Sequence, residues 1–285
     1  MGRYFAIYRP LNIVFIAIAQ WLCAYYLDVN ATYDSVREGG VYWLILGTAC
    51  CAAFGYWIND FLDQDRDAIN KEKPSAIGLI DEVAVYVHLG MFTLVALFAG
   101  IMLNIYFIGL FLVTIFVLFT YSKYLKNIAL TGNIVVSVLC FVSIIAVAKL
   151  FPTTDYLLVL HFAVLSSFVT FAREMVKDAE DIEGDKATGA ATLPITHGIQ
   201  SMNSSILIVS IFSIAFAIIS LFYQRGHFQD NLKYVYLAYV VIFILIPLFY
   251  VGVKAMGAKY KEDYSSLSQI LKYILYCGIL SILFF

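Results

Sequence analysis

The chain has 285 residues, of which 62% are hydrophobic and only 13% are charged, and its net charge is −2. Soluble domains have roughly 45–50% apolar and about 25% charged residues. The composition therefore excludes a soluble globular domain, and the lack of a basic region excludes a nucleic-acid-binding protein. The mean hydropathy of +0.86 comes from long apolar blocks, which are typical of a polytopic membrane protein.

Nine apolar blocks follow one another along the chain, each near the roughly 20 residues that a helix needs to cross a bilayer. Their apolar residues are continuous rather than alternating, which favours helices over a β-barrel. We therefore predict an all-α polytopic membrane protein with nine transmembrane helices. The predicted spans are residues 11–27, 41–58, 83–103, 106–121, 132–150, 156–172, 203–222, 234–253 and 267–285.

The basic residues are distributed unevenly between the two sides that nine spans define. One side has Arg3, Arg9, Arg66, Lys71, Lys73, Lys123, Lys126, Arg173, Lys177, Lys186, Lys254, Lys259 and Lys261. The other side has Arg37, Lys149, Arg225 and Lys233, while Lys272 lies inside the last span. Because cytoplasmic loops carry the excess of cations, we predict that the first side is cytoplasmic. The protein is then integral to the cytoplasmic (inner) membrane, with its N-terminus inside and its C-terminus outside.

Two acidic segments follow the second and the sixth predicted spans, both on the predicted cytoplasmic side. They contain ten of the twenty acidic residues: Asp60, Asp63, Asp65, Asp67, Glu174, Asp178, Glu180, Asp181, Glu183 and Asp185. Each segment carries a triplet with i, i+3, i+7 spacing, namely Asp60, Asp63 and Asp67, and Asp178, Asp181 and Asp185. On a helix that continues from the span, each triplet would share one face. Asn59 adds a neutral oxygen to the first face, and Asp65 points elsewhere, toward solvent.

Like charges stacked on one helix face repel each other unless something neutralises them. Mg²⁺ binds carboxylate oxygens and shares them with substrate phosphates, so two opposed acidic faces could hold a diphosphate through metal ions. The acids lie at helix ends, which predicts a polar site at the membrane surface above a cavity for a hydrocarbon tail. A solvated acidic patch is the simpler alternative, and a cation transporter or channel is the non-enzyme alternative. A CDP-alcohol phosphotransferase is disfavoured because its DGxxAR signature is absent.

The ordered motifs resemble those of the UbiA-type intramembrane prenyltransferases. "NDFLDQDRD" is similar to their NDxxDxxxD motif and "DIEGD" to their second, DxxxD, motif. "RPLN" at residues 9–12, "YSKYLK" at 121–126 and "GN" at 132–133 resemble further family elements. The resemblance covers nearly the whole chain. It implies a single transmembrane prenyltransferase domain over residues 1–285, with nine helices around a central cavity.

The resemblance also implies Mg²⁺-dependent transfer of an isoprenyl group from a prenyl diphosphate to a lipophilic acceptor. It implies that Asp60, Asp63, Asp181 and Asp185 are catalytic. It implies metal binding by Asn59, Asp60, Asp63, Asp67, Asp181 and Asp185, and Asp178 joins this set on its spacing. The expected substrate-binding residues are Arg9, Asn12, Arg66, Tyr121, Lys126, Arg173 and Lys177. For the last two, and for Arg9, the alternatives are neutralisation of nearby acids or anchoring at the membrane surface.

The second acidic segment is most similar to the digeranylgeranylglyceryl phosphate synthase-like subgroup. This implies a geranylgeranyl donor and geranylgeranylglyceryl phosphate as acceptor, in ether-lipid or isoprenoid biosynthesis. Prenylation of an aromatic acceptor in quinone biosynthesis is the alternative. Many quinone-directed relatives carry an arginine-proline element after the first motif, whereas this chain has "KEKPSAIG", with Lys73 before Pro74. That departure weakens the aromatic alternative.

Overall fold

The computed structural model of the chain describes residues 6–28, 30–70, 75–228 and 230–285. Arg3, Lys71, Lys73 and Pro74, on which parts of the charge count and the acceptor argument rest, lie outside these residues. Within the described ranges the chain is helical, and strand pairing is limited to the isolated bridges Asp28–Thr154 and Ile128–Ala191. The expected all-α class is confirmed.

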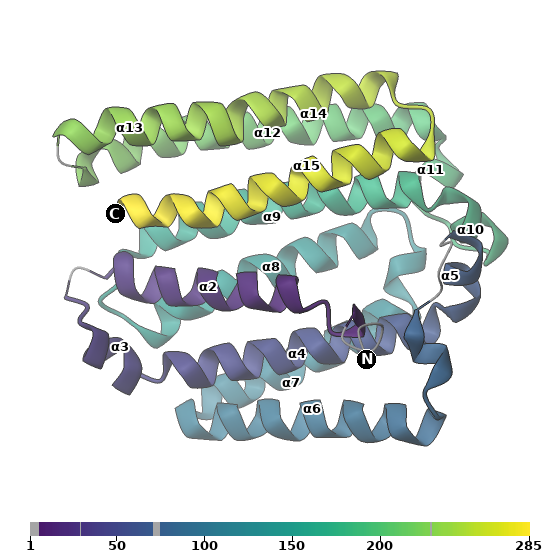
Figure 1. Ribbon diagram of the computed structural model, residues 1–285, viewed down its shortest axis with the longest axis horizontal. Helices are drawn as coiled ribbons and strands as arrows, with labels where there is room; N and C mark the ends of the chain where they lie inside the picture. The colour runs from purple at the N-terminus through teal and green to yellow at the C-terminus, as the bar shows by residue number, and fades with distance from the viewer. Residues whose placement is uncertain (1–5, 29, 71–74, 229) are drawn as a thin grey trace.

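The long helices run side by side along the longest axis of the molecule (Figure 1). They are α2 (Pro10–Tyr26), α4 (Val41–Leu62), α6 (Glu82–Leu103), α7 (Ile105–Lys123), α8 (Thr131–Leu150), α9 (Tyr156–Glu180), α12 (Ile199–Gln224), α13 (Asp230–Val240), α14 (Ile246–Gly257) and α15 (Lys261–Leu280). Short helices connect them: α3 (Tyr33–Glu38), α5 (Gln64–Asn70), α10 (Ile182–Ala187) and α11 (Leu193–Thr196). Single turns complete the path: η1 (Ala76–Leu79), η2 (Leu125–Asn127), η3 (Arg225–His227), η4 (Val241–Leu245) and η5 (Ser281–Phe284).

Eight segments in the described part of the chain are long and apolar enough to cross a membrane. The first predicted span corresponds to α2, which is apolar but has only 17 residues. The eighth corresponds to α13 and α14, which the π-helical turn η4 joins into one segment, Leu232–Gly257. The nine predicted spans thus match eight crossing segments and one shorter helix. The protein is therefore an integral membrane protein.

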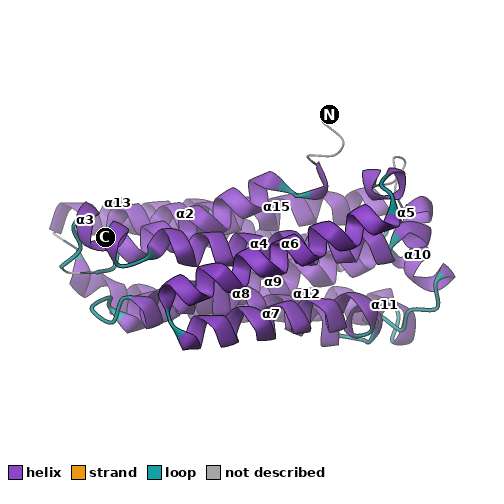
Figure 2. Ribbon diagram, turned by 90° about the horizontal axis from the view of Figure 1, so that it is seen from below, coloured by secondary structure: helices purple, strands orange, loops and turns teal. Residues whose placement is uncertain are grey.

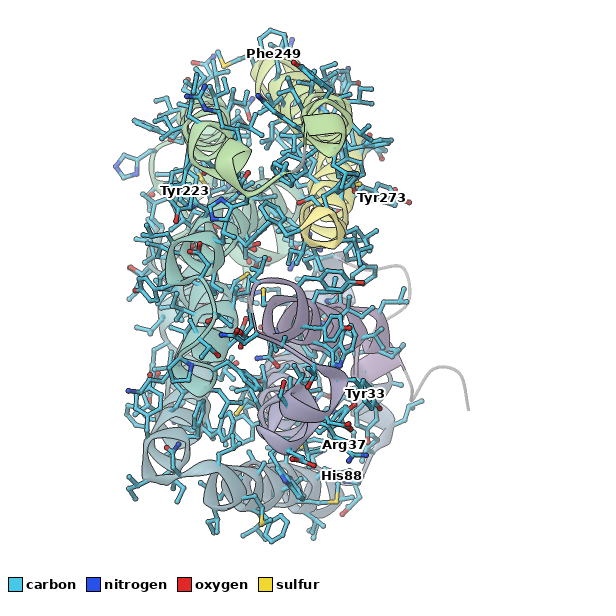
Figure 3. The ribbon with its side chains drawn as sticks, turned by 90° about the vertical axis from the view of Figure 1, so that its left-hand side faces the viewer. Tyr33, Arg37, His88, Tyr223, Phe249 and Tyr273 are labelled. Atoms are coloured by element: carbon cyan, nitrogen blue, oxygen red, sulfur yellow. The ribbon has the colours of Figure 1, made fainter. Side chains whose placement is uncertain are left out.

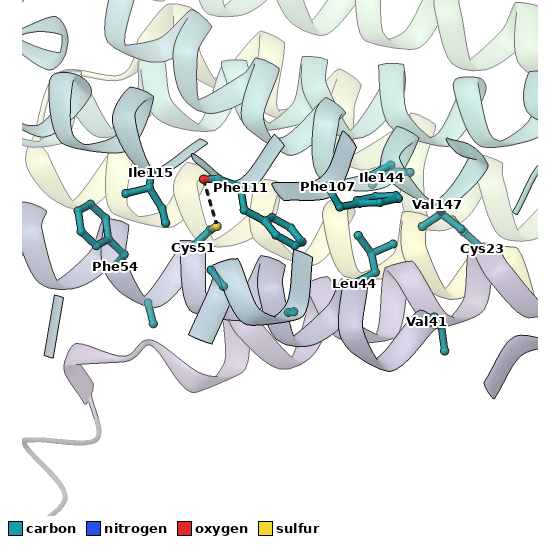
Figure 4. Packing of buried hydrophobic residues seen from close by; sticks show 14 of the residues in the cluster. Cys23, Val41, Leu44, Cys51, Phe54, Phe107, Phe111, Ile115, Ile144 and Val147 are labelled. Carbon is teal, nitrogen blue, oxygen red and sulfur yellow. Dashed lines mark hydrogen bonds between the residues drawn. The ribbon is translucent and has the colours of Figure 1, made fainter. Parts of the chain in front are cut away.

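The buried apolar side chains form two clusters, and α9 contributes to both. The first lies mainly between α2, α4, α6, α7 and α8, and the second between α9, α12, α14 and α15. Figure 4 shows part of the first, where the Cys51 thiol donates to the Phe111 carbonyl at 3.9 Å. A Cβ atom on Gly47 would lie 2.3 Å from the Phe111 ring, so this glycine allows α7 to approach α4 closely.

Large apolar side chains cover the outer surface of the bundle. Seen along the helices, Phe249 and Tyr273 point away from the bundle, and they are 65% and 64% exposed (Figure 3). Soluble proteins rarely expose apolar surface on this scale, whereas lipid tails solvate such side chains. The exposed faces are therefore the lipid-facing surface.

Polar caps begin several helices at the end of the bundle away from α5. The Asn104 side chain accepts a hydrogen bond from the Tyr106 N–H at 2.9 Å and starts α7. Asp155 starts α9 in the same way, accepting from the Leu158 N–H at 3.0 Å, and its other oxygen lies 2.9 Å from His227 Nε2. Burial acts to raise the pKa of Asp155, but the Leu158 N–H and His227 outweigh it, and the pKa lies below its usual value.

The short helices α5 and α10 lie together at one end of the bundle, and α3 lies at the other (Figures 1 and 2). The two follow the acidic ends of α4 and α9. Helix α2 begins at the same end, and α15 ends at the opposite one (Figure 1). The fold therefore gathers the motifs predicted to carry the chemistry at a single end.

Candidate functional site

A cavity of about 830 Å³ opens between α2, α4, α7, α8, α9 and α15. Charged side chains of α5, α9 and α10 line one end, and apolar residues such as Ala19, Phe111 and Ile144 line the other. Its wall follows α4 from Asp63 to Thr48, fifteen residues away, which corresponds to about 22 Å along a helix. The cavity can therefore hold a polar head at one end and a long hydrocarbon tail along its depth.

The two acidic segments share the same backbone geometry. Helix α4 ends at Leu62 and Asp63 has φ −99° and ψ 11°, while α9 ends at Glu180 and Asp181 has φ −98° and ψ 11°. The prediction that each triplet lies on an uninterrupted helix was therefore wrong, because each acidic segment bends at its middle aspartate. Bonds between residues four apart continue across both bends, from Asp67 N to Asp63 O at 2.8 Å and from Asp185 N to Asp181 O at 3.0 Å. The backbone therefore keeps a helix-like spacing between the acidic residues across each bend.

Asn70 joins the two acidic segments. Its Oδ1 accepts from the Gly184 N–H at 2.9 Å, and its Nδ2 donates to the Asp181 carbonyl at 3.2 Å. Gly184 lies in the first turn of α10, where helix N–H groups have no partner within the helix, so Asn70 caps α10 from α5. A Cβ atom on Gly184 would lie 2.4 Å from Asn70 Nδ2, so the contact requires glycine there.

Cations lie between the acidic side chains. Lys126 Nζ is 2.5 Å from Asp63 Oδ1 and 3.3 Å from Asn59 Oδ1. Arg66 Nε is 3.3 Å from Asp185 Oδ1, and an Arg66 Nη atom is 3.8 Å from Asp63. Burial lowers the pKa of Lys126, although Asp63 opposes this shift. Burial likewise raises the pKa of Asp185 against the opposing charge of Arg66. Both groups are thus held in an environment poor in water.

Asp60 does not line the cavity, unlike the other predicted metal ligands. It accepts from Arg9 Nη2 and from Ser75 Oγ, both at 2.8 Å, and it is not among the side chains that line the cavity. Arg9 does line the cavity, with φ 46°, a left-handed conformation that is strained for a non-glycine residue. It also lies over the Tyr56 ring, 4.7 Å from the centroid. The structure therefore places Asp60 as a partner that orients Arg9.

The remaining predicted residues all line the cavity: Asn12, Tyr121, Asp178, Arg173 and Lys177. Arg173 Nη1 is 3.2 Å and Lys177 Nζ is 3.6 Å from Glu174, so both neutralise an acid while they face the cavity. Asp65 is exposed, as expected from its position.

The sequence interpretation did not assign Asn70 or Asn133 to the site, although Asn133 Nδ2 donates to Asp178 at 2.8 Å. In the sequence, Asn70 follows the first acidic motif and Asn133 belongs to the "GN" element. These positions were the only sign that either asparagine belongs to the site.

Known proteins are similar to this one over most of the chain. The profile of the UbiA prenyltransferase family matches residues 10–269. A digeranylgeranylglyceryl phosphate synthase from Methanothermobacter thermautotrophicus is 34% identical over 247 residues, 86% of this chain and 83% of that protein. One from Methanosphaera stadtmanae is 28% identical over 280 residues, 96% of this chain and 94% of that protein.

Solved structures share the fold. One, from work on digeranylgeranylglyceryl phosphate synthase in membranes, has a TM-score of 0.73 at 21% identity, covering 99% of this chain and 96% of that one. A UbiA homolog from Archaeoglobus fulgidus bound to GPP and Mg²⁺ has a TM-score of 0.68 at 15% identity, covering 98% and 99%. The match of sequence, fold and motif order leads to one conclusion. This chain belongs to the UbiA prenyltransferase family.

Proposed function

We propose that this prenyltransferase transfers a geranylgeranyl group from geranylgeranyl diphosphate to the free hydroxyl of geranylgeranylglyceryl phosphate. The observation that carries the proposal is the junction of two acidic segments at the polar end of a deep, largely apolar cavity. Such a cavity suits a diphosphate with a long tail. The relatives named digeranylgeranylglyceryl phosphate synthase support the choice of donor and acceptor.

Mg²⁺ is the proposed cofactor. In the described ranges, no three His, Cys, Asp or Glu side chains lie close enough to form a complete metal site. This arrangement fits Mg²⁺, which usually takes one or two carboxylates together with water and substrate phosphates. The predicted ligands that line the cavity offer hard oxygen atoms: Asn59, Asp63, Asp67, Asp178, Asp181 and Asp185. When bound there, Mg²⁺ would neutralise the charge of the diphosphate.

The cations beside the acids have a separate role. We assign Lys126 and Arg66 to the departing diphosphate, because both are half-buried donors that line the cavity beside the acidic residues. Donors fixed in a site with little water stabilise developing charge strongly. Arg9, held by Asp60, adds a third positive group, and Arg173 and Lys177 face the acceptor side.

The reaction is a substitution at the first carbon of the donor. The bond from this carbon to the diphosphate oxygen breaks, and the diphosphate leaves with the electron pair. The acceptor hydroxyl oxygen forms a bond to the same carbon, and its proton passes to the released diphosphate. Tyr56 and Tyr121 line the cavity and offer aromatic faces to the allylic cation. The apolar wall keeps out water, which would otherwise capture that cation.

We propose a cytoplasmic location for the acidic end of the bundle, in the cytoplasmic membrane, since the excess of Lys and Arg lies on that side. We also propose that residues 1–285 act as one prenyltransferase domain. The orientation can be tested by introducing a single cysteine into either α3 or α10 and labelling it in intact cells. Only the variant in α3 should react with an impermeant thiol reagent; the reverse pattern would contradict the proposal.

The acceptor can be tested with purified protein, geranylgeranyl diphosphate and Mg²⁺. The acceptors to compare are geranylgeranylglyceryl phosphate, 4-hydroxybenzoate and 1,4-dihydroxy-2-naphthoate. We expect an ether product with the first alone. A prenylated aromatic product would instead assign the enzyme to quinone biosynthesis. Release of diphosphate without any prenylated product would remove the acceptor assignment.

A further inference from the structure

Lys272 differs from the other cations of the cavity. Five of the six that line it lie within 4 Å of a carboxylate: Arg9, Arg66, Lys126, Arg173 and Lys177. Lys272 lines the same cavity and forms no such ion pair with any residue that the structure describes. A lysine inside a membrane-crossing helix is costly, and it usually faces a polar cavity with a functional partner. The partner of Lys272 is therefore to be sought in the cavity.

Two residues that line the cavity also carry a buried donor without a hydrogen-bond partner. Tyr276 lies one turn after Lys272 on α15, and its hydroxyl is buried and makes no hydrogen bond. Its ring stacks on Phe15 of α2 at 3.5 Å, and Lys272 Nζ lies 5.6 Å from the ring centroid. The Nε atom of Arg173, on α9, is also buried without a hydrogen-bond partner. A buried donor that lacks a partner destabilises the protein, and a ligand that accepts its hydrogen bond removes this cost.

Arg173 and Lys272 lie at the same depth. Helices α9 and α15 are antiparallel neighbours (Figure 1). Near one end of the pair the Glu180 side chain meets Ser265, and near the other the Phe162 ring lies 5.8 Å from Phe285. In antiparallel helices, one residue number falls as its neighbour's rises. Counting seven residues back from Glu180 and seven forward from Ser265 pairs Arg173 with residue 272, and counting from Phe162 and Phe285 pairs it with residue 274. Arg173 and Lys272 therefore face the cavity from adjacent helices at one level.

We propose that Lys272, Tyr276 and Arg173 form a second anion site, which binds the phosphate monoester of the lipid acceptor. This inference rests on the proposed function. It adds the cation Lys272 and the hydroxyl donor Tyr276 to the cations proposed to face the acceptor. The charges favour a phosphate over a neutral headgroup, because Lys272 brings a positive charge that no described carboxylate balances. The three hydrogen-bond donors come from two helices, α9 and α15, and a phosphate group has enough oxygen atoms to accept from all of them.

The depth of this site suits the reaction. Arg173 lies five residues from Asp178 on α9, so the second anion site is about 8 Å farther into the membrane than this acid. The reacting carbon of the donor joins the diphosphate to its tail, so it also lies on the membrane side of the acids. An acceptor whose phosphate binds Lys272 would thus present its nearby hydroxyl to that carbon.

The test compares Lys272→Met, Lys272→Arg and Tyr276→Phe with the wild type. Tyr276→Phe removes the hydroxyl and retains the ring that stacks on Phe15. The matched control is Lys254→Met, which removes an exposed lysine of α14 that does not line the cavity. For each protein, KM would be measured for geranylgeranyl diphosphate, for geranylgeranylglyceryl phosphate and for the dephosphorylated acceptor, geranylgeranylglycerol.

We expect Lys272→Met to raise KM for the phosphorylated acceptor about tenfold or more, as the loss of a charge-assisted hydrogen bond does. KM for the donor and for the dephosphorylated acceptor should not change. Lys272→Arg should retain most of the affinity, Tyr276→Phe should show a smaller rise, and Lys254→Met should match the wild type. An unchanged acceptor KM, or an equal rise in donor KM, would overturn the anion site.

Failure of the proposed function would look different. In that case the wild type itself would transfer nothing to geranylgeranylglyceryl phosphate. Equilibrium binding of this radiolabelled lipid to detergent-solubilised wild type and Lys272→Met would then decide the anion site alone. Weaker binding by the variant supports it, and equal binding overturns it.

Discussion

Replacing Asn70 by alanine tests whether the two acidic segments must be joined for catalysis. The variant loses the acceptor for the Gly184 N–H and the donor to the Asp181 carbonyl. Both bonds link α5 to α10, and neither belongs to the packing of the long helices. The Lys261 contact uses the Asn70 main-chain carbonyl and remains in the variant. The perturbation is therefore local to the junction of the two acidic segments.

The size of the effect follows from the two bonds. Loss of a side-chain cap costs about 0.5–2 kcal/mol, and loss of an ordinary hydrogen bond costs about 1 kcal/mol. Together they weaken the junction by about 1.5–3 kcal/mol. Since about 1.4 kcal/mol corresponds to a factor of ten, we expect kcat/KM to fall between about tenfold and somewhat more than a hundredfold.

The assay is prenyl transfer by purified Asn70→Ala as a function of Mg²⁺ concentration, together with thermal unfolding in the same detergent. Asn104→Ala is the control, because it removes an asparagine cap of similar strength at the opposite end of the bundle. The control should lose similar stability and keep its activity. If Asn70→Ala transferred at the wild-type rate, or if both variants lost activity equally, joining the segments through Asn70 would not matter for catalysis.

Three other changes have defined outcomes. Lys126→Met removes the cation nearest Asp63, and steady-state kinetics should show kcat/KM for the donor lowered about tenfold or more; unchanged kinetics would refute its role. Gly184→Ala should lower transfer because its Cβ displaces the Asn70 side chain, and equal rates in mutant and wild type would contradict this. Asp155→Ala should destabilise the protein by about 1 kcal/mol through loss of a cap, without changing either KM. Because the pKa of Asp155 is lowered, its stabilisation is present above the usual carboxyl pKa and is lost as the pH falls through the lowered value, which unfolding at several pH values would show.

The long helices could be predicted from sequence because the bilayer imposes a simple rule. A helix that crosses it needs a continuous apolar run, and such runs end at residues with clear local roles, such as Asn104 and Asp155. The matched spacing of the two aspartate triplets also predicted that they act together. Both inferences depend on local patterns, which a single sequence displays directly.

Contacts between residues far apart in the sequence could not be predicted from these local patterns. Spacing grouped Asp60 with Asp63 as a metal ligand, but it gave no reason to expect that Asp60 binds Arg9 and Ser75 and does not line the cavity. Spacing also gave no reason to pair Asn70 with Gly184, which is 114 residues away. The helices α4 and α9 end before Asp63 and Asp181, and no residue type in either segment indicates these ends.

The central claim is that the two acidic segments form one diphosphate site, and a double-mutant cycle on Asp63→Asn and Asp181→Asn tests it most directly. The measurement is kcat/KM for transfer from geranylgeranyl diphosphate at saturating Mg²⁺. Each single variant should lose about a hundredfold or more, and the double variant should lose less than the product of the two losses. Wild-type activity in either single variant, or strictly multiplicative losses in the double variant, would contradict a shared site.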